Sequence, residues 1–145
     1  MRQIKFRAQD IASNKWLYGD LRHHKDDVCI FEQGGTKGEQ VKRDTVGQFT
    51  GLRDINGKDI YEGDILRSPS GNIVAVEFGY KEHIVKHGWP NITDSFACYG
   101  WIARNVKKGI TDFFDNEFAA GEVIGNIYDN PELIAEDMNI QIRED

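Results

Sequence analysis

The feature that most constrains this chain is a series of closely spaced turn signals between short apolar runs. Asn56-Gly57, Glu62-Gly63-Asp64 and residues 68–72 each favour a reversal of the backbone, because Gly, Asn and Asp tolerate the φ angles of tight turns. The Val-rich run at 73–78 is too short for a typical helix and has the β-branched composition of a strand. The pattern therefore predicts short antiparallel strands.

Residues 63–66 have the sequence Gly-Asp-Ile-Leu, and a turn and a Val-rich strand follow. This order is typical of small SH3-like barrels, in which the Gly permits a sharp bend and the Asp binds turn amides. At the N-terminus, Ile4, Phe6 and Ala8 alternate with charged residues, which predicts a strand with one buried face. Further strands are predicted in the following ranges: 16–18, 28–31, 46–49, 96–104 and 122–128.

One short helix is predicted near the C-terminus. Asn130 is the expected N-cap, Pro131 occupies the first helical position, and the helix is expected to reach about residue 137. A chain of 145 residues suits one domain. We therefore predict a mainly β single domain over 1–145, a partly open barrel or sandwich of short antiparallel strands with an SH3-like segment and a short C-terminal helix.

Charge is unevenly distributed along the chain. The net charge is −6, but residues 112–145 contain ten acids and one base, which gives −9, and residues 1–111 are left with +3. The acidic segment is either a solvated surface or a contact for the basic N-terminal strand. No window approaches the ~18 apolar residues of a membrane span, and the first ten residues lack the apolar core of a secretion signal. We expect a cytoplasmic protein without membrane contact.

Four carboxylates, at Asp54, Asp59, Glu62 and Asp64, lie close together in sequence and raise the question of a metal site. A calcium loop that began at Asp54 would require Gly at its sixth position and Glu at its twelfth, and the sequence satisfies neither requirement. Acids near turns usually accept hydrogen bonds from backbone amides, so the sequence favours a structural role for them. A metal-dependent hydrolase that uses these clustered carboxylates remains an alternative.

Other chemical motifs are weaker. His83 and His87 have the spacing of metal ligands on a helix, but a solvated loop or short helix over 81–90 is the better interpretation. Cys29 and Cys98 are expected to be buried thiols in a reducing compartment. The sequence predicts no catalytic residue, metal ligand or cofactor.

Nucleic-acid binding is a further alternative. Lys5, Arg7 and Lys15 lie near Phe6 and Trp16, and basic residues among aromatic ones are typical of nucleic-acid surfaces. Phe6, however, alternates away from the two basic side chains beside it, and the sequence pI of about 5.2 disfavours a polyanion partner.

Three stretches, 4–8, 49–66 and 123–133, together resemble the YopX-like proteins of phages and prophages. Gln9 departs from this pattern, because an aromatic residue is usual there. The residues that we single out as structural motif positions are Gly51, Asp54, Asn56, Gly57, Tyr61, Glu62, Gly63, Asp64, Gly125, Asn126, Asn130 and Pro131.

The resemblance implies a mostly β fold, an origin in a mobile element and self-association, and it implies no catalytic site. Self-association is also predicted by 16 aromatic residues (3 Trp, 5 Tyr and 8 Phe), by open strand edges and by the charge asymmetry. The preferred hypothesis is a non-enzymatic accessory protein that forms homo-oligomers and binds a phage or host protein. Residues 80–118 match no pattern, and the sequence identifies neither the partner nor the number of subunits.

Overall fold

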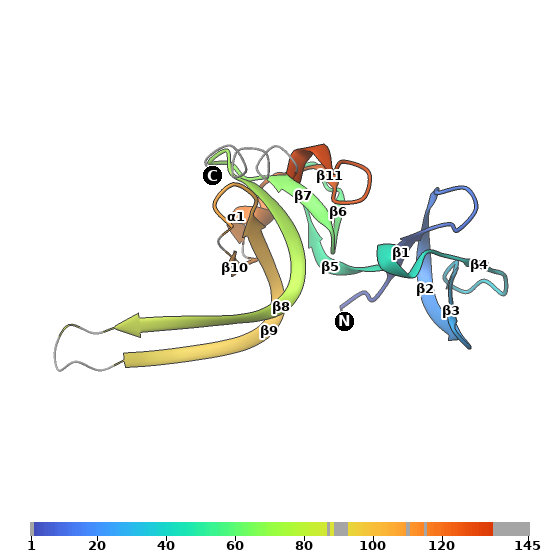
Figure 1. The fold of residues 1–145 in the computed structure, drawn as a ribbon, viewed down its shortest axis with the longest axis horizontal. Coiled ribbons are helices and arrows are strands. Elements are labelled where there is room, and N and C mark those ends of the chain that lie inside the picture. The colour runs from blue at the N-terminus through green and yellow to red at the C-terminus, as the bar shows by residue number, and fades with distance from the viewer. Residues whose placement is uncertain (1, 87, 89–92, 110, 115, 135–145) are drawn as a thin grey trace, which may run out of the picture.

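A computed structural model describes residues 2–86, 88, 93–109, 111–114 and 116–134. It is built from two antiparallel sheets (Figure 1), with strand orders β4-β3-β2-β1-β5-β6 and β10-β9-β8-β7-β11. Within the described residues neither sheet closes into a barrel, and the predicted mainly β fold is confirmed. The strands are β1 (Phe6–Gln9), β2 (Trp16–His24), β3 (Asp27–Phe31), β4 (Gly38–Gln40), β5 (Gly47–Arg53), β6 (Asp59–Tyr61), β7 (Asp64–Arg67), β8 (Ile73–Lys86), β9 (Thr93–Asn105), β10 (Thr111–Phe113) and β11 (Glu122–Asn126).

The N-terminal strands form consecutive hairpins. The predicted turn between β1 and β2 is present, and Asn14 has φ of 62°. Ala8, Val28, Ile30 and Val41 form one buried apolar cluster in this region. The prediction that only one face of β1 is buried was wrong, because Arg7 on the other face is only 5% exposed.

Strands β5 and β6 end the first sheet, and the chain then passes into the second sheet. The short 3₁₀ helix η1 (Arg43–Thr45) precedes β5. The β5–β6 turn is where the sequence placed it, but only Gly57 has a positive φ, of 80°, and its N–H donates to the Asp54 carbonyl. At Glu62-Gly63 the chain changes sheets, because β6 pairs with β5 while β7 pairs with β8 and β11. The SH3-like character of this segment stays a prediction.

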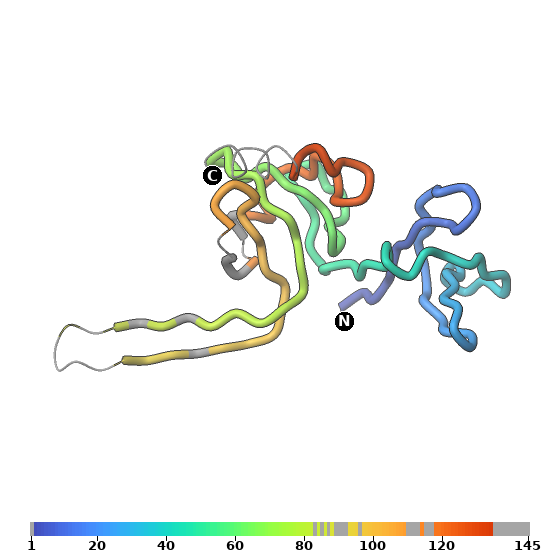
Figure 2. Tube along the Cα trace, viewed as in Figure 1, coloured from blue at the N-terminus to red at the C-terminus, as the bar shows by residue number. Residues whose placement is uncertain are grey.

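The second sheet is dominated by the β8–β9 hairpin. Its strands pair continuously from Val74 with Asn105 to Lys86 with Thr93. Figures 1 and 2 show this hairpin curving away from the other strands and projecting beyond them. The loop or short helix predicted for 81–90 is wrong up to Lys86, because β9 supplies a hydrogen-bonded partner along the whole of β8.

The C-terminal region adds helix α1 (Asn116–Ala119) and β11. The sequence left residues 110–118 as a helical turn or irregular loop, and the structure forms β10 and α1 there. Residues 132–134 are helical, as predicted, whereas the expected end near 137 lies outside the described residues. The second apolar cluster unites the two sheets, and its buried members are Ile60, Leu66, Val74, Val76 and Ala103. No helix among the described residues has the length and hydrophobicity to cross a membrane.

Candidate functional site

The three stretches that resemble the YopX pattern meet in space where the two sheets join. β1 contributes Arg7, the β6–β7 connection contributes residues 61–64, and the segment after β11 contributes Ile127 and Tyr128. We call this region the inter-sheet junction. Backbone hydrogen bonds fix it from both sides, because the Gly63 N–H donates to the Val76 carbonyl at 2.8 Å and the Ile127 N–H donates to the Gly63 carbonyl at 2.9 Å.

A buried ion pair occupies the centre of the junction. Arg7 Nη2 lies 2.8 Å from Asp64 Oδ1, and the two side chains are 6% and 2% exposed. Asp64 Oδ2 accepts a hydrogen bond of 2.7 Å from the Tyr61 N–H, as the sequence predicted for this carboxylate. Burial raises the pKa of Asp64, although Arg7 and the Tyr61 N–H both favour its charged form. The pair links β1 of the first sheet to β7 of the second.

Aromatic rings enclose the Arg7 guanidinium. Its central carbon lies 4.7 Å from the centre of the Trp16 ring and 5.0 Å from that of Tyr61. Such contacts favour a cation that has been removed from water. Arg7 Nη2 also donates to the Glu62 carbonyl at 3.4 Å. The site therefore holds the guanidinium by two rings, one carboxylate and one carbonyl, whereas the buried Arg7 Nε has no hydrogen-bond partner.

The segment after β11 docks on the first hairpin through Asp129. Asp129 accepts hydrogen bonds from Trp16 Nε1 at 2.7 Å, from Gln9 Nε2 at 3.1 Å and from Asn126 Nδ2 at 3.1 Å. The bond from Trp16 is the largest cause that lowers the pKa of Asp129. Gln9, the position where the sequence departs from the YopX-like pattern, therefore contributes a polar contact to the same interface.

Two further motif residues shape the segment around β11. The sequence predicted that Asn130 caps the following helix. The structure differs, because the side-chain oxygen Oδ1 accepts a hydrogen bond from the Asn126 N–H at 3.1 Å. Gly125 lies at the irregularity where β11 shifts register against β7, and Pro131 is exposed at the start of the helical residues. The Asn126 Oδ1 in turn accepts from the Tyr128 and Asp129 amides.

The remaining acids of the central motif have structural partners. Asp54 accepts from the N–H groups of Asn56, Lys58 and Val123. Burial raises its pKa, but these three bonds outweigh that effect and the pKa of Asp54 lies below its usual value. Asp59 contacts Lys5 at 2.6 Å and Arg53 at 2.9 Å.

Glu62 and Gly51 are the other two central motif positions. Burial raises the pKa of Glu62, and Gly51 is exposed in β5 with φ of 88°. Among the described residues no three acids, histidines or cysteines are grouped so that they could hold a metal ion. His83 lies in β8, not on a helix, and His87 lies outside the described residues. The expectation of buried thiols was wrong, because Cys29 is half-buried and Cys98 is exposed.

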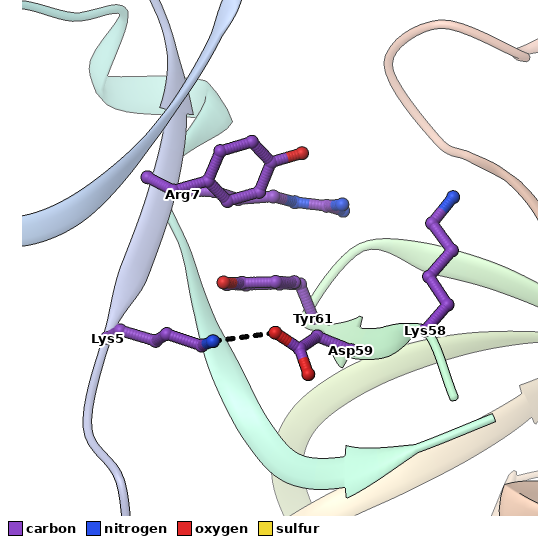
Figure 3. Close-up of a pocket in the computed structure, with 6 residues that line it drawn as sticks. Lys5, Arg7, Lys58, Asp59 and Tyr61 are labelled. Carbon is purple, nitrogen blue, oxygen red and sulfur yellow. Dashed lines mark hydrogen bonds and ion pairs between the residues drawn. The ribbon is translucent and has the colours of Figure 1, made fainter.

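A cavity of about 270 Å³ lies beside the junction (Figure 3), and its lining residues are Lys5, Arg7, Tyr18, Lys58, Asp59 and Tyr61. The sequence grouped Lys5 and Arg7 with Lys15, but Lys15 does not line the cavity. Sequence reasoning missed Lys58, because only the folding of the β5–β6 turn toward β1 and β2 brings it to the same cavity as Lys5 and Tyr18.

A second candidate surface lies on the β8–β9 hairpin. We call the part from Phe78 and Trp101 to Lys86 and Thr93 the arm. One side of it, the aromatic face, presents cross-strand pairs with ring centres 5.2 Å apart for Phe78 and Trp101 and 5.4 Å apart for Tyr80 and Tyr99. The sequence predicted a strand at 96–104, which lies within β9 (Thr93–Asn105). The signal for the other strand was the alternation of large residues at 78, 80 and 84, but the strand expected at 73–78 ended at residue 78.

The comparisons with known proteins agree with the resemblance seen in the sequence. The family model described as YopX protein matches residues 5–135. No curated protein matches the chain. A crystal structure of protein EF1440 from Enterococcus faecalis is similar over 92% of this chain and 99% of that one, with 22% identity and a TM-score of 0.44. Because the family match spans most of the sequence, the chain belongs to the YopX family.

Proposed function

We propose that this protein is a non-enzymatic accessory protein of a phage or prophage that self-associates through the arm. The phage or prophage origin rests on the family resemblance. The observation that carries the proposal is the exposure of the aromatic face: Tyr99 is 74% exposed, Phe78 56%, Ile84 54% and Tyr80 52%. Large apolar groups gathered on one side of a projecting hairpin are typical of an interaction surface.

The aromatic face continues the hydrophobic core. Val76, which pairs with Ala103 on the same side of the hairpin, is fully buried. Phe78 lies two residues further along β8 on the same side and pairs with Trp101. Unlike Val76, Phe78 is exposed. A two-stranded ribbon alone is marginally stable in water. A partner that covers this face would therefore stabilise the arm as the core stabilises its base.

A second copy of the chain fits this face because its charges are self-complementary. Glu82, Ile84 and Lys86 follow one another on the same side of β8, and all three are exposed. If two arms pack face to face in opposite directions about a two-fold axis at Ile84, Glu82 of each copy faces Lys86 of the other. An isologous contact of this kind needs no second type of protein.

The size of the arm sets the expected strength of association. Nine paired positions, from Phe78 to Lys86, span about 30 Å at roughly 3.4 Å per residue. One face of such a ribbon covers about 300 Å², well below the roughly 800 Å² that each partner buries in a stable complex. We therefore expect a reversible dimer in the micromolar range or weaker.

The charge asymmetry of the sequence gives this dimer little support. Lys5 and Arg7, the basic residues of the N-terminal strand, already pair with Asp59 and Asp64 of the same chain. They are thus largely neutralised and have little charge left for the acidic C-terminal segment of another copy. The apolar contact supports the proposal, and moderate salt is expected to weaken the dimer without abolishing it.

The test is sedimentation equilibrium over a wide concentration range with variants of the two charged positions. In Glu82→Lys the new lysine of each copy faces Lys86 of the other copy, so the symmetric dimer holds two repulsive contacts. We expect the dimer to weaken by about 2- to 30-fold. The matched control is the double variant Glu82→Lys/Lys86→Glu, which restores both contacts in the reverse sense. Recovery of the wild-type affinity supports the antiparallel arrangement.

Two outcomes count against the proposal. A mass of 16.6 kDa for the wild type at every concentration would refute self-association. A dimer that Glu82→Lys leaves unchanged would show that the arms do not meet in this way.

We also propose that residues 1–145 form one domain. The buried cluster that contains Ile60 of the first sheet and Leu66 of the second supports a single folding unit. Urea unfolding is expected to show one transition when it is followed by both tryptophan fluorescence and far-ultraviolet circular dichroism. Two separate transitions would show that the sheets unfold independently.

A further inference from the structure

An unpaired stretch of strand edge lies in the first sheet, where β2 extends beyond the end of β3. β1 pairs with residues 16–19 of β2, whereas β3 pairs with β2 only from Asp20 onward. No described strand therefore pairs with residues 16–18 on the side away from β1. We propose that this edge binds an extended segment of another protein in which a basic residue stands between two apolar ones. The inference does not depend on the arm or on self-association.

The backbone groups of Trp16 and Tyr18 point to the unpaired side. The Asp10 N–H donates to the Lys15 carbonyl at 2.8 Å, so Lys15 directs its carbonyl toward β1. Because successive residues of an antiparallel strand direct their N–H and C=O groups to opposite edges, residues 17 and 19 also face β1, and residues 16 and 18 face away. Trp16 and Tyr18 thus offer two donors and two acceptors, which an added antiparallel strand would satisfy.

A cavity of about 450 Å³ lies along this edge. Residues 16–18 line it on the β2 side, and Glu32 and Lys37 line it on the side of the loop that follows β3. The chain turns away from the line of β3 in this loop, where the Gly35 N–H donates to the Glu32 carbonyl at 2.7 Å. The cavity therefore lies where β3 would continue, and an added strand of about three to five residues would take that position.

One side of the edge fits a long basic side chain. Ile30 pairs with Leu21 of β2 and with Glu39 of β4, so these three residues lie on the same side of the sheet. Leu17, four residues before Leu21, is on that side too. Leu17, Ile30 and Glu39 all line the cavity. A lysine or arginine of the bound strand can lay its methylene stem against the two apolar residues and bring its charge beside Glu39.

The charges of the cavity favour a basic side chain over an acidic one. Two carboxylates, Glu32 and Glu39, line the cavity with one ammonium, Lys37. None of the three forms an ion pair with another residue that the structure describes. Since the whole protein has a net charge of −6, both the cavity and the surrounding field attract a basic partner.

The other side of the edge fits apolar side chains. Trp16 and Tyr18 lie on the opposite side of β2 from Leu17, and Tyr18 is 51% exposed. A hydrogen bond to Asp129 orients the Trp16 ring, and an edge-to-face contact with Tyr61 orients the Tyr18 ring. Pairs of an aromatic and a β-branched residue on neighbouring strands are favourable. A bound strand with an apolar residue on each side of its basic one therefore matches both sides of the edge.

The test adds the peptide acetyl-Thr-Val-Arg-Val-Thr-amide to the full chain and follows hydrogen exchange of the Trp16 and Tyr18 amides by nuclear magnetic resonance. Because the contact is small, we expect a dissociation constant of roughly 0.1–1 mM. At about four times that concentration both amides should exchange about fivefold more slowly. The matched control is the same peptide with both valines N-methylated, which keeps the side chains but cannot complete the strand hydrogen bonds and should leave exchange unchanged.

Glu39→Lys tests the charged contact. This variant should bind the arginine peptide at least about threefold more weakly than the wild type. The peptide acetyl-Thr-Val-Glu-Val-Thr-amide should bind Glu39→Lys more tightly than it binds the wild type. Glu122→Lys is the matched control, because Glu122 is exposed, lies outside the cavity and gives the same change of net charge. It should alter binding less than about twofold.

Four outcomes overturn the proposal. Exchange of both amides that stays unchanged up to roughly 5 mM peptide would show that the edge accepts no such segment. Equal slowing by the N-methylated peptide would show that binding is not strand addition. Slowing that grows with protein concentration in the absence of peptide would assign the edge to a second copy of the chain. Equal weakening by Glu39→Lys and Glu122→Lys would indicate general attraction to an acidic protein.

Discussion

The inter-sheet junction and the arm use large side chains in opposite ways. At the junction, Arg7 and Asp64 are charged yet nearly inaccessible, and rings and backbone amides surround them. On the arm, Tyr80 and Tyr99 are mainly apolar yet face water. The first arrangement costs desolvation energy that good geometry offsets, which points to a structural purpose. The second leaves apolar area unburied, which points to a partner.

The largest expected effect is at the junction. Arg7→Ala or Asp64→Ala leaves one buried charge without its partner, and each should lower the free energy of unfolding by about 3–5 kcal/mol. Urea unfolding measures this change. The double variant Arg7→Met/Asp64→Leu removes both charges and keeps apolar volume, so it should lose less than either single variant. Single variants within about 1 kcal/mol of wild type would show that the ion pair does not hold the two sheets together.

A smaller effect is expected at Gly63. Its φ is 91°, and a Cβ there would lie 3.1 Å from Tyr128 Cε2. Gly63→Val should therefore destabilise the protein by about 1–3 kcal/mol. Gly57→Val is the matched comparison, because Gly57 also has a positive φ, of 80°, but nothing lies within 4 Å of its added Cβ. Equal losses in thermal unfolding would show that backbone strain alone, and not packing at the junction, restricts Gly63.

Acid should weaken the contacts around the junction. The pKa values of Asp54, Asp59 and Asp129 are lowered in the folded protein. Since a lowered pKa stabilises the fold above the unfolded value of 3.8, this contribution is lost as the pH falls through the folded pKa values. Burial raises the pKa values of Asp64 and Glu62, so these two groups act in the opposite sense as they take up protons. We therefore expect the free energy of unfolding to decline below the unfolded value of 3.8, where the three lowered groups still titrate in the folded protein.

Asp129→Asn tests the origin of this acid sensitivity. The variant should make the decline with pH shallower, while Asp26→Asn, in the exposed β2–β3 turn, serves as the control. An identical decline in wild type and Asp129→Asn would exclude Asp129 as a cause.

The sequence predicted the junction better than the arm, for physical reasons. Gly63 and Asp64 were assigned to a turn because local backbone chemistry decides such positions. The burial of Arg7 could not be predicted, because its carboxylate partner lies far along the chain and alternation alone places a charged residue toward water. Lys58 and Tyr18 likewise meet only through tertiary folding.

The length of β8 and β9 was missed for another reason. Residues 81–86 have charged and apolar residues in a pattern that fits several local structures, and the following Gly-Trp-Pro suggested a loop. The pairing of the two strands over thirteen positions settles their conformation. Such pairing is a property of two segments together, which no single stretch of sequence reveals.

The most direct test of the contrast between junction and arm combines mass and stability in one variant, Tyr80→Ser/Tyr99→Ser. Both side chains are exposed, so we expect the free energy of unfolding of the monomer to change by less than about 1 kcal/mol. By sedimentation equilibrium, the wild type should approach twice 16.6 kDa with rising concentration, while the variant stays at the monomer mass. A variant that associates as the wild type does, or a wild type that stays monomeric throughout, would contradict the assignment of the arm as the contact between copies.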